Sequence, residues 1–222
     1  MASYMSAEAP FTVLFVCTGN ICRSPIAERV TRSYLDAALG PDADCVRLGS
    51  AGTQAVVGSG VHARSAAVLT SLGGDSGGFA ARQLTDDMAV AADLTLGLTR
   101  NHRRAVLKRS PRGLSRTFTV LEAADLASLI PMDAELPGAT FAERCRSLVR
   151  EMAAARSRRA SDVRDDIPDP FGESEAFHEE VGDAIADGIV RLFSRFADLS
   201  TVPRVVPGRE DQESWAYHLS RH

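Results

Sequence analysis

The chain has 222 residues, which is enough for one ordinary domain. Apolar residues make up 45% and charged residues 24%, and this average composition argues against global disorder. The formal net charge of -4 gives no support to nucleic-acid binding, and no apolar run approaches the roughly 20 residues of a membrane span. Residues 1–10 lack a basic region and the apolar run after them is too short for a signal peptide, so we expect a cytoplasmic protein.

The cysteines do not form the pattern of a disulfide scaffold or of a metal site. Only four are present, and the chain has no Cys-x-x-Cys pair and no His-rich segment of the kind that binds zinc. We therefore expect free thiols, no metal and no other cofactor. Cys17 and Cys22 lie close together in the sequence, whereas Cys45 and Cys145 stand alone and are expected to be buried or incidental thiols.

Apolar runs and helical spacings alternate along the chain. Residues 11–16 form a short β-branched and aromatic run that predicts a buried parallel strand. A helical spacing begins at Ser24, with Pro25 in its first turn, and ends near Gly40. Further strands are expected over residues 45–50, 92–98 and 116–121, and further helices over 63–72, 101–108, 122–130, 141–160 and 173–199, with a short helix after Thr85. This alternation predicts an α/β fold, a four-stranded parallel sheet flanked by helices on both faces.

One segment carries the chemical signal, and it lies between the first expected strand and the first expected helix. It reads Cys17-Thr18-Gly19-Asn20-Ile21-Cys22-Arg23-Ser24. The five residues between Cys17 and Arg23 can wrap into a cradle whose N–H groups point inward, and the following helix adds its positive end. Such a phosphate-binding loop suits a tetrahedral dianion, and the same donors would stabilise a thiolate at its base.

The residue types in this loop fit that role. Arg23 can bind two oxygens of an anion at once, and Ser24 can hydrogen-bond the sulfur of Cys17. Gly19 and Asn20 suit the left-handed backbone that a tight loop requires. The alternative is a buried cysteine before an ordinary turn, because so short a pattern also occurs by chance. Its position between strand and helix favours the functional interpretation.

The run from Val16 to Pro25, followed by Ala27-Glu28, resembles the signature of low-molecular-weight protein-tyrosine phosphatases. Three later segments agree with that family in their order along the chain: Ser50-Ala51-Gly52-Thr53, Ala81-Arg82-Gln83-Leu84-Thr85 and Asp169-Pro170-Phe171-Gly172. The resemblance covers residues 11–130 and 165–198. It implies one domain over residues 10–200 with a four-stranded parallel sheet and an insertion at 131–165. Residues 201–222, with two prolines and many polar side chains, are expected to form a C-terminal tail.

The resemblance also implies a mechanism that needs no metal. Cys17 would attack phosphorus and form a phosphocysteine intermediate, while the phosphate-binding loop holds the oxygens. The phosphate-binding residues would be Thr18, Gly19, Asn20, Ile21, Cys22 and Arg23. Asp169 would protonate the leaving phenolate and then activate water, and Phe171 would stack on the aromatic leaving group. Taken alone, Asp169 also fits a simple turn, and Phe171 also fits an anchor that holds the loop against the last helix.

Two roles are open for Cys22. The resemblance implies a reversible disulfide with Cys17 under peroxide, which would be a protective or regulatory step. The alternative is a thiol that packs beside the phosphate-binding loop.

The sequence departs from the family around the expected cleft. Residues 54–60 contain no aromatic side chain where the family often has a bulky wall, and residues 97–102 lack the family's common Asp. These changes keep the phosphate chemistry in place but leave phosphotyrosine specificity open. The basic cluster over residues 100–109 is interpreted as a solvated helix face rather than a site for an anionic partner.

The leading hypothesis is therefore a phosphomonoester hydrolase that acts on phosphotyrosyl proteins or another phosphomonoester. One alternative is a thiol-dependent arsenate reductase, which shares the fold and the loop. Residues 46–144 contain no cysteine, however, so an internal resolving pair is missing and a small-molecule thiol would have to replace it. Another alternative is a non-catalytic phosphate-binding regulator, although binding alone requires neither Cys17 as a nucleophile nor Asp169 as an acid. The oligomeric state is not predicted.

Overall fold

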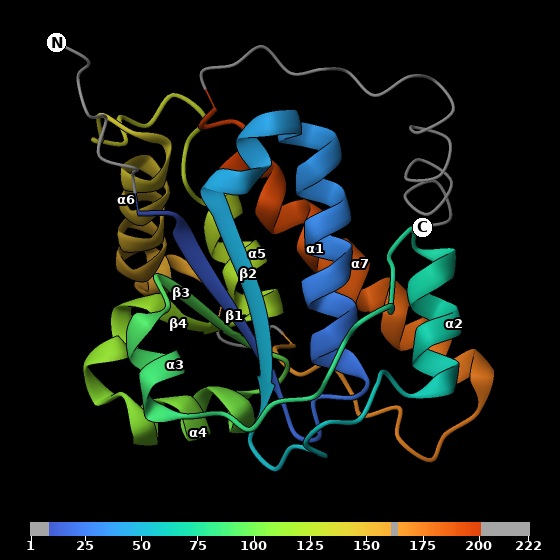
Figure 1. The fold of residues 1–222 in the computed structure, drawn as a ribbon. Helices are drawn as coiled ribbons and strands as arrows, with labels where there is room; N and C mark the ends of the chain where they lie inside the picture. Colours follow the sequence, from blue (N-terminus) through green and yellow to red (C-terminus); the bar gives the residue numbers. More distant parts are fainter. Residues whose placement is uncertain (1–8, 161–163, 201–222) are drawn as a thin grey trace, which may run out of the picture.

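A four-stranded parallel sheet forms the centre of the computed structural model, which describes residues 9–160 and 164–200 (Figure 1). Its strands are β1 (Phe11–Cys17), β2 (Val46–Gly52), β3 (Leu94–Gly97) and β4 (Thr117–Thr119). They lie in the order β2-β1-β3-β4, and every neighbouring pair is parallel. The α/β fold expected from the sequence is therefore confirmed.

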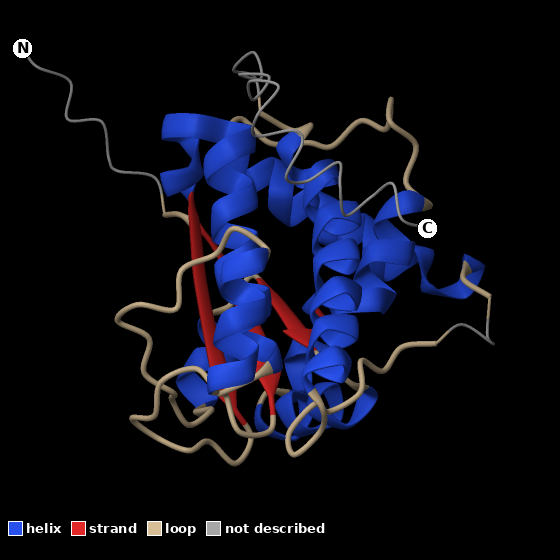
Figure 2. Cartoon of the chain, turned by 90° about the vertical axis from the view of Figure 1, so that its right-hand side faces the viewer, coloured by secondary structure: helices blue, strands red, loops and turns tan. Residues whose placement is uncertain are grey.

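Helices cover both faces of this sheet. They are α1 (Arg23–Leu39), α2 (Ala63–Ser71), α3 (Asp86–Ala91), α4 (Arg100–Arg109), α5 (Val120–Ser128), α6 (Phe141–Ala154) and α7 (Glu175–Ala197), with short 3-10 turns η1 (Gly40–Cys45), η2 (Pro111–Arg116) and η3 (Ala155–Arg158). Helices α1, α5 and α7 pack on one face, whereas α3 and α4 pack on the other. The loops that follow the strands gather at the lower end of the molecule in Figures 1 and 2, where the phosphate-binding loop joins β1 to α1.

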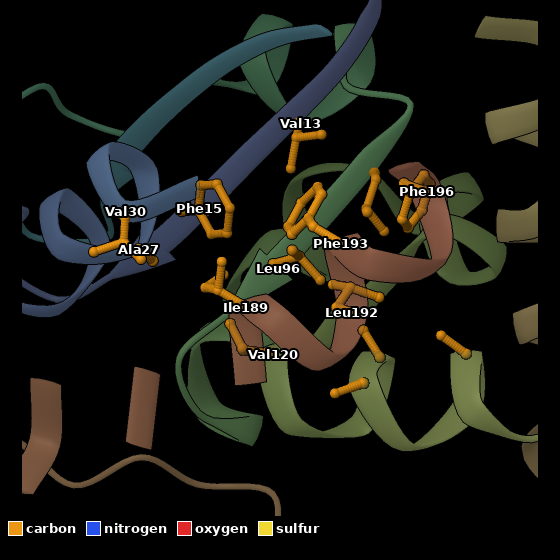
Figure 3. Packing of buried hydrophobic residues seen from close by; sticks show 14 of the residues in the cluster. Val13, Phe15, Ala27, Val30, Leu96, Val120, Ile189, Leu192, Phe193 and Phe196 are labelled. Carbon is orange, nitrogen blue, oxygen red and sulfur yellow. The ribbon is translucent and has the colours of Figure 1, made fainter. Parts of the chain in front are cut away.

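The alternating side chains of β1 divide the core into two layers. Val13 and Phe15 point to the face covered by α1, α5 and α7, while Leu14 and Val16 point to the face covered by α3 and α4. Figure 3 shows the first layer, in which the ring centroids of Phe15 and Phe193 lie 6.3 Å apart. Because each fully buried side chain of this size contributes roughly 1.5–3 kcal/mol, this packing fixes the position of β1 and of the loop that follows it.

Two glycines interrupt the apolar face of α7, and close helix packing explains them. A Cβ at Gly182 would collide with Val68 Cγ1 on α2. A Cβ at Gly188 would lie 2.9 Å from Val120 Cγ1 on α5, which is shorter than van der Waals contact. The cost of glycine in a helix, about 1 kcal/mol each, is therefore offset by the close approach of three helices.

Helix α6, which lies in the expected insertion, packs into the main core. It begins with a capping box, in which Thr140 accepts from the Glu143 N–H and the Glu143 side chain bonds back. Its buried residues are Ala142, Cys145, Ser147, Leu148, Val149 and Met152. Burial raises the pKa of the Cys145 thiol, as expected for an unreactive cysteine, and Cys45 is partly exposed. The expected tail over residues 201–222 lies outside the described residues.

The predicted boundary between the fourth strand and the helix after it was wrong. Strand β4 has three residues rather than the six expected over 116–121, and α5 begins at Val120 instead of residue 122. Thr119 and Glu122 form a capping box, which starts the helix directly after the strand. The apolar run continues through this point, so periodicity alone could not separate the two elements.

Candidate active site

The segment after β2 holds the phosphate-binding loop, because its backbone N–H groups donate hydrogen bonds to the carbonyl oxygens of the loop. The four hydrogen bonds run from Thr53 N–H to Cys17 O (2.9 Å), from Gln54 N–H to Thr18 O (2.9 Å), from Val56 N–H to Gly19 O (3.0 Å) and from His62 N–H to Ile21 O (2.7 Å). The carbonyl oxygens therefore point away from the centre of the loop. This leaves the N–H groups of the loop to face its interior, next to the N-terminus of α1, which is the arrangement that an anion cradle needs.

The buried side chain of Asn20 fixes the curvature of the loop through three hydrogen bonds. It has a φ of 55° and is fully buried. Its Nδ2 donates to Ser24 Oγ and to Ser50 Oγ, both at 2.9 Å, and its Oδ1 accepts from the Arg82 N–H at 2.8 Å. Asn20 thus adopts the left-handed backbone expected from the sequence. Gly19 does not adopt it, so the expectation for that residue was wrong.

The sulfur of Cys17 lies at the base of the loop with two donors beside it. Ser24 Oγ is 2.9 Å from Cys17 Sγ, and the Asn20 N–H donates to the same sulfur at 3.2 Å. Because Ser24 Oγ already accepts from Asn20 Nδ2, its own hydrogen is available for the sulfur. Two donors are therefore directed at the sulfur of Cys17.

Arg23 and Asp169 come together from opposite ends of the chain. Arg23 opens α1 and is 4% exposed. Its Nη2 donates to Asp169 Oδ2 at 2.5 Å, and its Nη1 donates to the Ile167 carbonyl at 3.1 Å. The Ile167 N–H in turn donates to the Leu98 carbonyl at 2.9 Å, which attaches the loop of Asp169 to the end of β3. The side chain of Asp169 is half-exposed and faces the pocket.

A pocket of about 230 Å³ opens above the sulfur. It is lined by Cys17, Thr18, Gly19, Ile21, Cys22, Arg23, Gln54, Val56, Asp169 and Phe171. Most residues singled out in the sequence therefore meet in one pocket, with Asn20 and Ser24 buried beneath it. Gln54 and Val56 were missed as lining residues, since the segment after β2 was noted only for its lack of an aromatic side chain.

Cys22 and Phe171 differ sharply in their surroundings. Cys22 is buried, and burial raises the pKa of its thiol, although a hydrogen bond with Ser65 opposes the shift. Phe171 is 64% exposed at the mouth of the pocket. Its ring meets His62, at the start of α2, edge-on with 5.8 Å between centroids. This exposure argues against the anchor that the sequence left open for Phe171.

His102 is the clearest residue that the sequence analysis missed. The basic cluster over residues 100–109 was interpreted as a solvated face, and that is wrong for His102, which is 5% exposed. Its Nε2 lies 3.0 Å from Thr18 Oγ1 in the phosphate-binding loop. The available signal was its spacing from Val106, since the two buried side chains lie four residues apart on the inner face of α4.

Within residues 9–160 and 164–200, no group of three or more His, Cys, Asp or Glu side chains is arranged to hold a metal ion. No helix in this part of the chain combines the length and the apolar character that a membrane crossing requires. The positive charge at the pocket comes from the Arg23 guanidinium and from the N-terminus of α1.

Comparison with known proteins agrees with this geometry. The family model described as low molecular weight phosphotyrosine protein phosphatase matches residues 12–125, just over half of the chain. Low molecular weight protein-tyrosine phosphatase A of Mycobacterium tuberculosis (strain ATCC 25618 / H37Rv) is 46% identical over 97 residues, which are 43% of this chain and 56% of that protein. The Etp phosphatase of Escherichia coli (strain K12) is 37% identical over 107 residues, which are 48% of this chain and 67% of that protein. The chain thus spans little more than half the length of the mycobacterial relative.

Solved structures extend the likeness to most of the chain. A low molecular weight protein tyrosine phosphatase from T. tengcongensis matches with a TM-score of 0.61 at 24% identity, covering 83% of this chain and 98% of that one. The YwlE arginine phosphatase from Geobacillus stearothermophilus matches with a TM-score of 0.59 at 25% identity, covering 83% and 92%. Fold, loop and family model agree, and the chain belongs to the low molecular weight phosphotyrosine protein phosphatase family.

Proposed function

We propose that the protein is a phosphomonoester hydrolase that removes phosphate from phosphotyrosine in proteins. One observation carries the proposal: the Cys17 sulfur lies at the base of an anion cradle whose rim holds Arg23 and Asp169. Family membership and the names of the relatives support it. We place the activity in one domain over residues 10–200 and in the cytoplasm.

In the first step, the Cys17 thiolate attacks phosphorus, and the bond between phosphorus and the ester oxygen breaks. Arg23 and the N–H groups of the loop hold the remaining oxygens as charge moves through the transition state. Asp169, in its protonated form, gives its proton to the leaving oxygen. Substrate must first take the place of Asp169 on the guanidinium, because the two side chains form an ion pair at 2.5 Å.

In the second step, water attacks phosphorus of the phosphocysteine, and the bond between phosphorus and sulfur breaks. Asp169, now a carboxylate, accepts a proton from that water, and inorganic phosphate leaves. The departing thiolate returns to the donors that Ser24 and Asn20 direct at its sulfur. The cysteine and the carboxyl group end the cycle in the forms in which they began it.

The lining of the pocket favours an aromatic leaving group. Ile21, Val56 and Phe171 give its mouth an apolar character, which suits a phenyl ring better than a charged group. The Geobacillus neighbour is named as an arginine phosphatase, so phosphoarginine is the comparison substrate that tests this preference. The arsenate reductase alternative is not favoured, because the family model and the relatives named above are phosphatases.

The test is hydrolysis of a phosphotyrosyl peptide, a phosphoarginyl peptide and a simple aryl phosphate, with a thiol reductant and a metal chelator present. Cys17→Ser should abolish hydrolysis of all three, while the matched control Cys45→Ser should leave it unchanged. Residual turnover in Cys17→Ser would show that the nucleophile is wrong. Faster hydrolysis of the phosphoarginyl peptide would replace phosphotyrosine as the proposed substrate, and inactivity of the folded wild type would reject the phosphatase.

A further inference from the structure

A chain of hydrogen bonds runs from the start of α4 to the phosphate-binding loop through His102. Thr99 is the N-cap of α4 and accepts the His102 N–H at 3.3 Å. Thr99 Oγ1 also lies 3.0 Å from Nδ1 of the same imidazole. On the other side of the ring, Nε2 lies 3.0 Å from Thr18 Oγ1. Both ring nitrogens of this buried side chain therefore face hydroxyl groups.

The imidazole is neutral at physiological pH. Burial, the largest cause, and the positive charge of Arg23 together lower the pKa of His102 to about 4, although the carboxylates of Asp169 and Asp166 oppose the shift. A neutral imidazole has one N–H donor and one acceptor nitrogen. The position of the single hydrogen then decides which of the two threonine hydroxyls donates and which accepts.

The contacts of Thr99 favour one tautomer. If Nδ1 carried the hydrogen, Thr99 Oγ1 would accept two bonds from His102, and the Thr99 hydroxyl hydrogen would be left to solvent in the polar groove that Thr99 lines. If Nε2 carries it, the Thr99 hydroxyl donates to Nδ1, and Nε2–H donates to Thr18 Oγ1. Every polar hydrogen in this chain of hydrogen bonds then has an acceptor within it, except the hydroxyl hydrogen of Thr18.

That remaining hydrogen belongs to a hydroxyl at the pocket. Thr18 lines the pocket above Cys17, and also a more open polar groove on the other side of Asp169. With its oxygen engaged by Nε2–H, the Thr18 hydroxyl has its hydrogen free to donate toward a bound anion. The opposite tautomer would take this hydrogen for Nε2 and present oxygen lone pairs to a dianion, which repels it.

We propose that His102 is a positioning residue that turns the Thr18 hydroxyl into a hydrogen-bond donor for a phosphoryl oxygen. The proposal rests on the proposed function, and it adds a side-chain donor to the backbone donors of the loop. His102 itself does not touch the substrate. It acts through Thr18, and Thr99 sets its tautomer from the far side of the ring.

The tautomer is tested directly by NMR, using two-bond correlations between ring protons and ring nitrogens. The chain has five histidines, and the His102→Phe spectrum identifies the signals that belong to His102. A neutral ring with hydrogen on Nε2 is expected across neutral pH. Hydrogen on Nδ1, or a charged ring at neutral pH, would overturn the proposal. This measurement needs no substrate, so its outcome does not depend on whether the protein hydrolyses phosphate esters.

The consequence for binding is tested with inorganic phosphate as the probe, measured by calorimetry on the wild type and on single and double variants. Thr18→Val should weaken phosphate binding about tenfold or more, the usual effect of losing a hydrogen bond to a charged group, while Thr18→Ser keeps the hydroxyl and should bind like the wild type. His102→Phe should weaken binding by about twofold or more, as residues coupled in one hydrogen-bond network do.

The double variant separates positioning from a purely structural effect. In the Thr18→Val background, His102→Phe should cause no further loss, because the hydroxyl that it orients is already absent. Equal losses in both backgrounds, or no loss at all from His102→Phe, would overturn the proposal. Absence of phosphate binding by the wild type would instead reject the proposed function, and the NMR result would still decide whether His102 donates to Thr18.

Discussion

Replacing Asp169 with asparagine should slow catalysis and at the same time tighten phosphate binding. The Asp169 carboxylate lies 2.5 Å from Arg23 Nη2, so it holds an edge of the guanidinium that the proposed mechanism assigns to phosphate. Asparagine keeps the size of the side chain but removes its charge and its transferable proton. The leaving group then departs without an acid, while phosphate no longer competes with a carboxylate for Arg23.

The structure sets the size of both effects. A unit charge 4 Å from another is repelled by about 1 kcal/mol in water and by about 4 kcal/mol at an effective dielectric constant near 20. The Asp169 side chain is 50% exposed, which favours the lower end of this range. A gain of about 1.4 kcal/mol corresponds to roughly tenfold tighter phosphate binding. General acid catalysis typically contributes about 10²- to 10⁴-fold, so turnover of a phosphotyrosyl peptide should fall by about that factor.

The assay compares two esters and one inhibitor. An aryl phosphate with a good leaving group needs little protonation, so Asp169→Asn should slow it far less than it slows the phosphotyrosyl peptide. Inorganic phosphate, measured as a competitive inhibitor, reports the change in binding. Asp166→Asn is the matched control, because Asp166 lies in the same loop but pairs with Arg100, 3.4 Å away, instead of Arg23.

Two results would refute the reasoning. Equal slowing of both esters by Asp169→Asn would show that Asp169 is not the acid. Weaker phosphate binding in the same variant would show that the carboxylate does not compete with phosphate for Arg23. If Asp166→Asn reproduced either effect, the cause would be a disturbed loop rather than the chemistry of one carboxyl group.

Two further predictions concern oxidation and packing. Cys22→Ser should make inactivation by peroxide irreversible, whereas the wild type and Cys45→Ser should recover with a thiol reductant. The reason is that Cys22 lines the same pocket as Cys17, while Cys45 and Cys145 do not, so Cys22 can capture oxidised Cys17 as a disulfide. Equal recovery of all three proteins would contradict this role. Gly182→Ala should lower the free energy of unfolding by about 1–3 kcal/mol, since its methyl group collides with Val68. In a Val68→Ala background the same change should stabilise by up to about 1 kcal/mol through helix propensity, and denaturant unfolding of the four proteins measures both.

The parts of the site that are local in sequence could be predicted. The run before Cys17 has the composition of a buried strand, and a helix start follows at once, so the loop and its place in the fold follow from neighbouring residues. The pairing of Arg23 with Asp169 joins residues 146 positions apart. Nothing local in the sequence indicates that contact, and only the family resemblance brought Asp169 into the predicted site.

The parts that depend on which way a side chain faces could not be predicted. His102 lies among arginines, so its charge pattern indicates solvent, yet the packing of α4 against the sheet turns it inward with Val106. Ser50 was noted only as part of a family-like segment, although its Oγ receives Asn20 Nδ2 and donates to Glu28 Oε2 at 2.5 Å. Such contacts become visible only when strands and loops from separate parts of the chain are placed together.

The order of the strands explains why the site lies where it does. Strand β1 lies between β2 and β3 in the sheet, so the connection after β1 runs to one side and the connection after β3 runs to the other. The two connections therefore diverge at the carboxyl end of the sheet, which is where open α/β folds bind ligands. The loop after β2 donates its N–H groups to the carbonyls of the phosphate-binding loop, and the segment after β3 supplies His102 and the carbonyl that holds Ile167. Substitutions in these two flanking segments should therefore alter phosphate binding even where they line no part of the pocket.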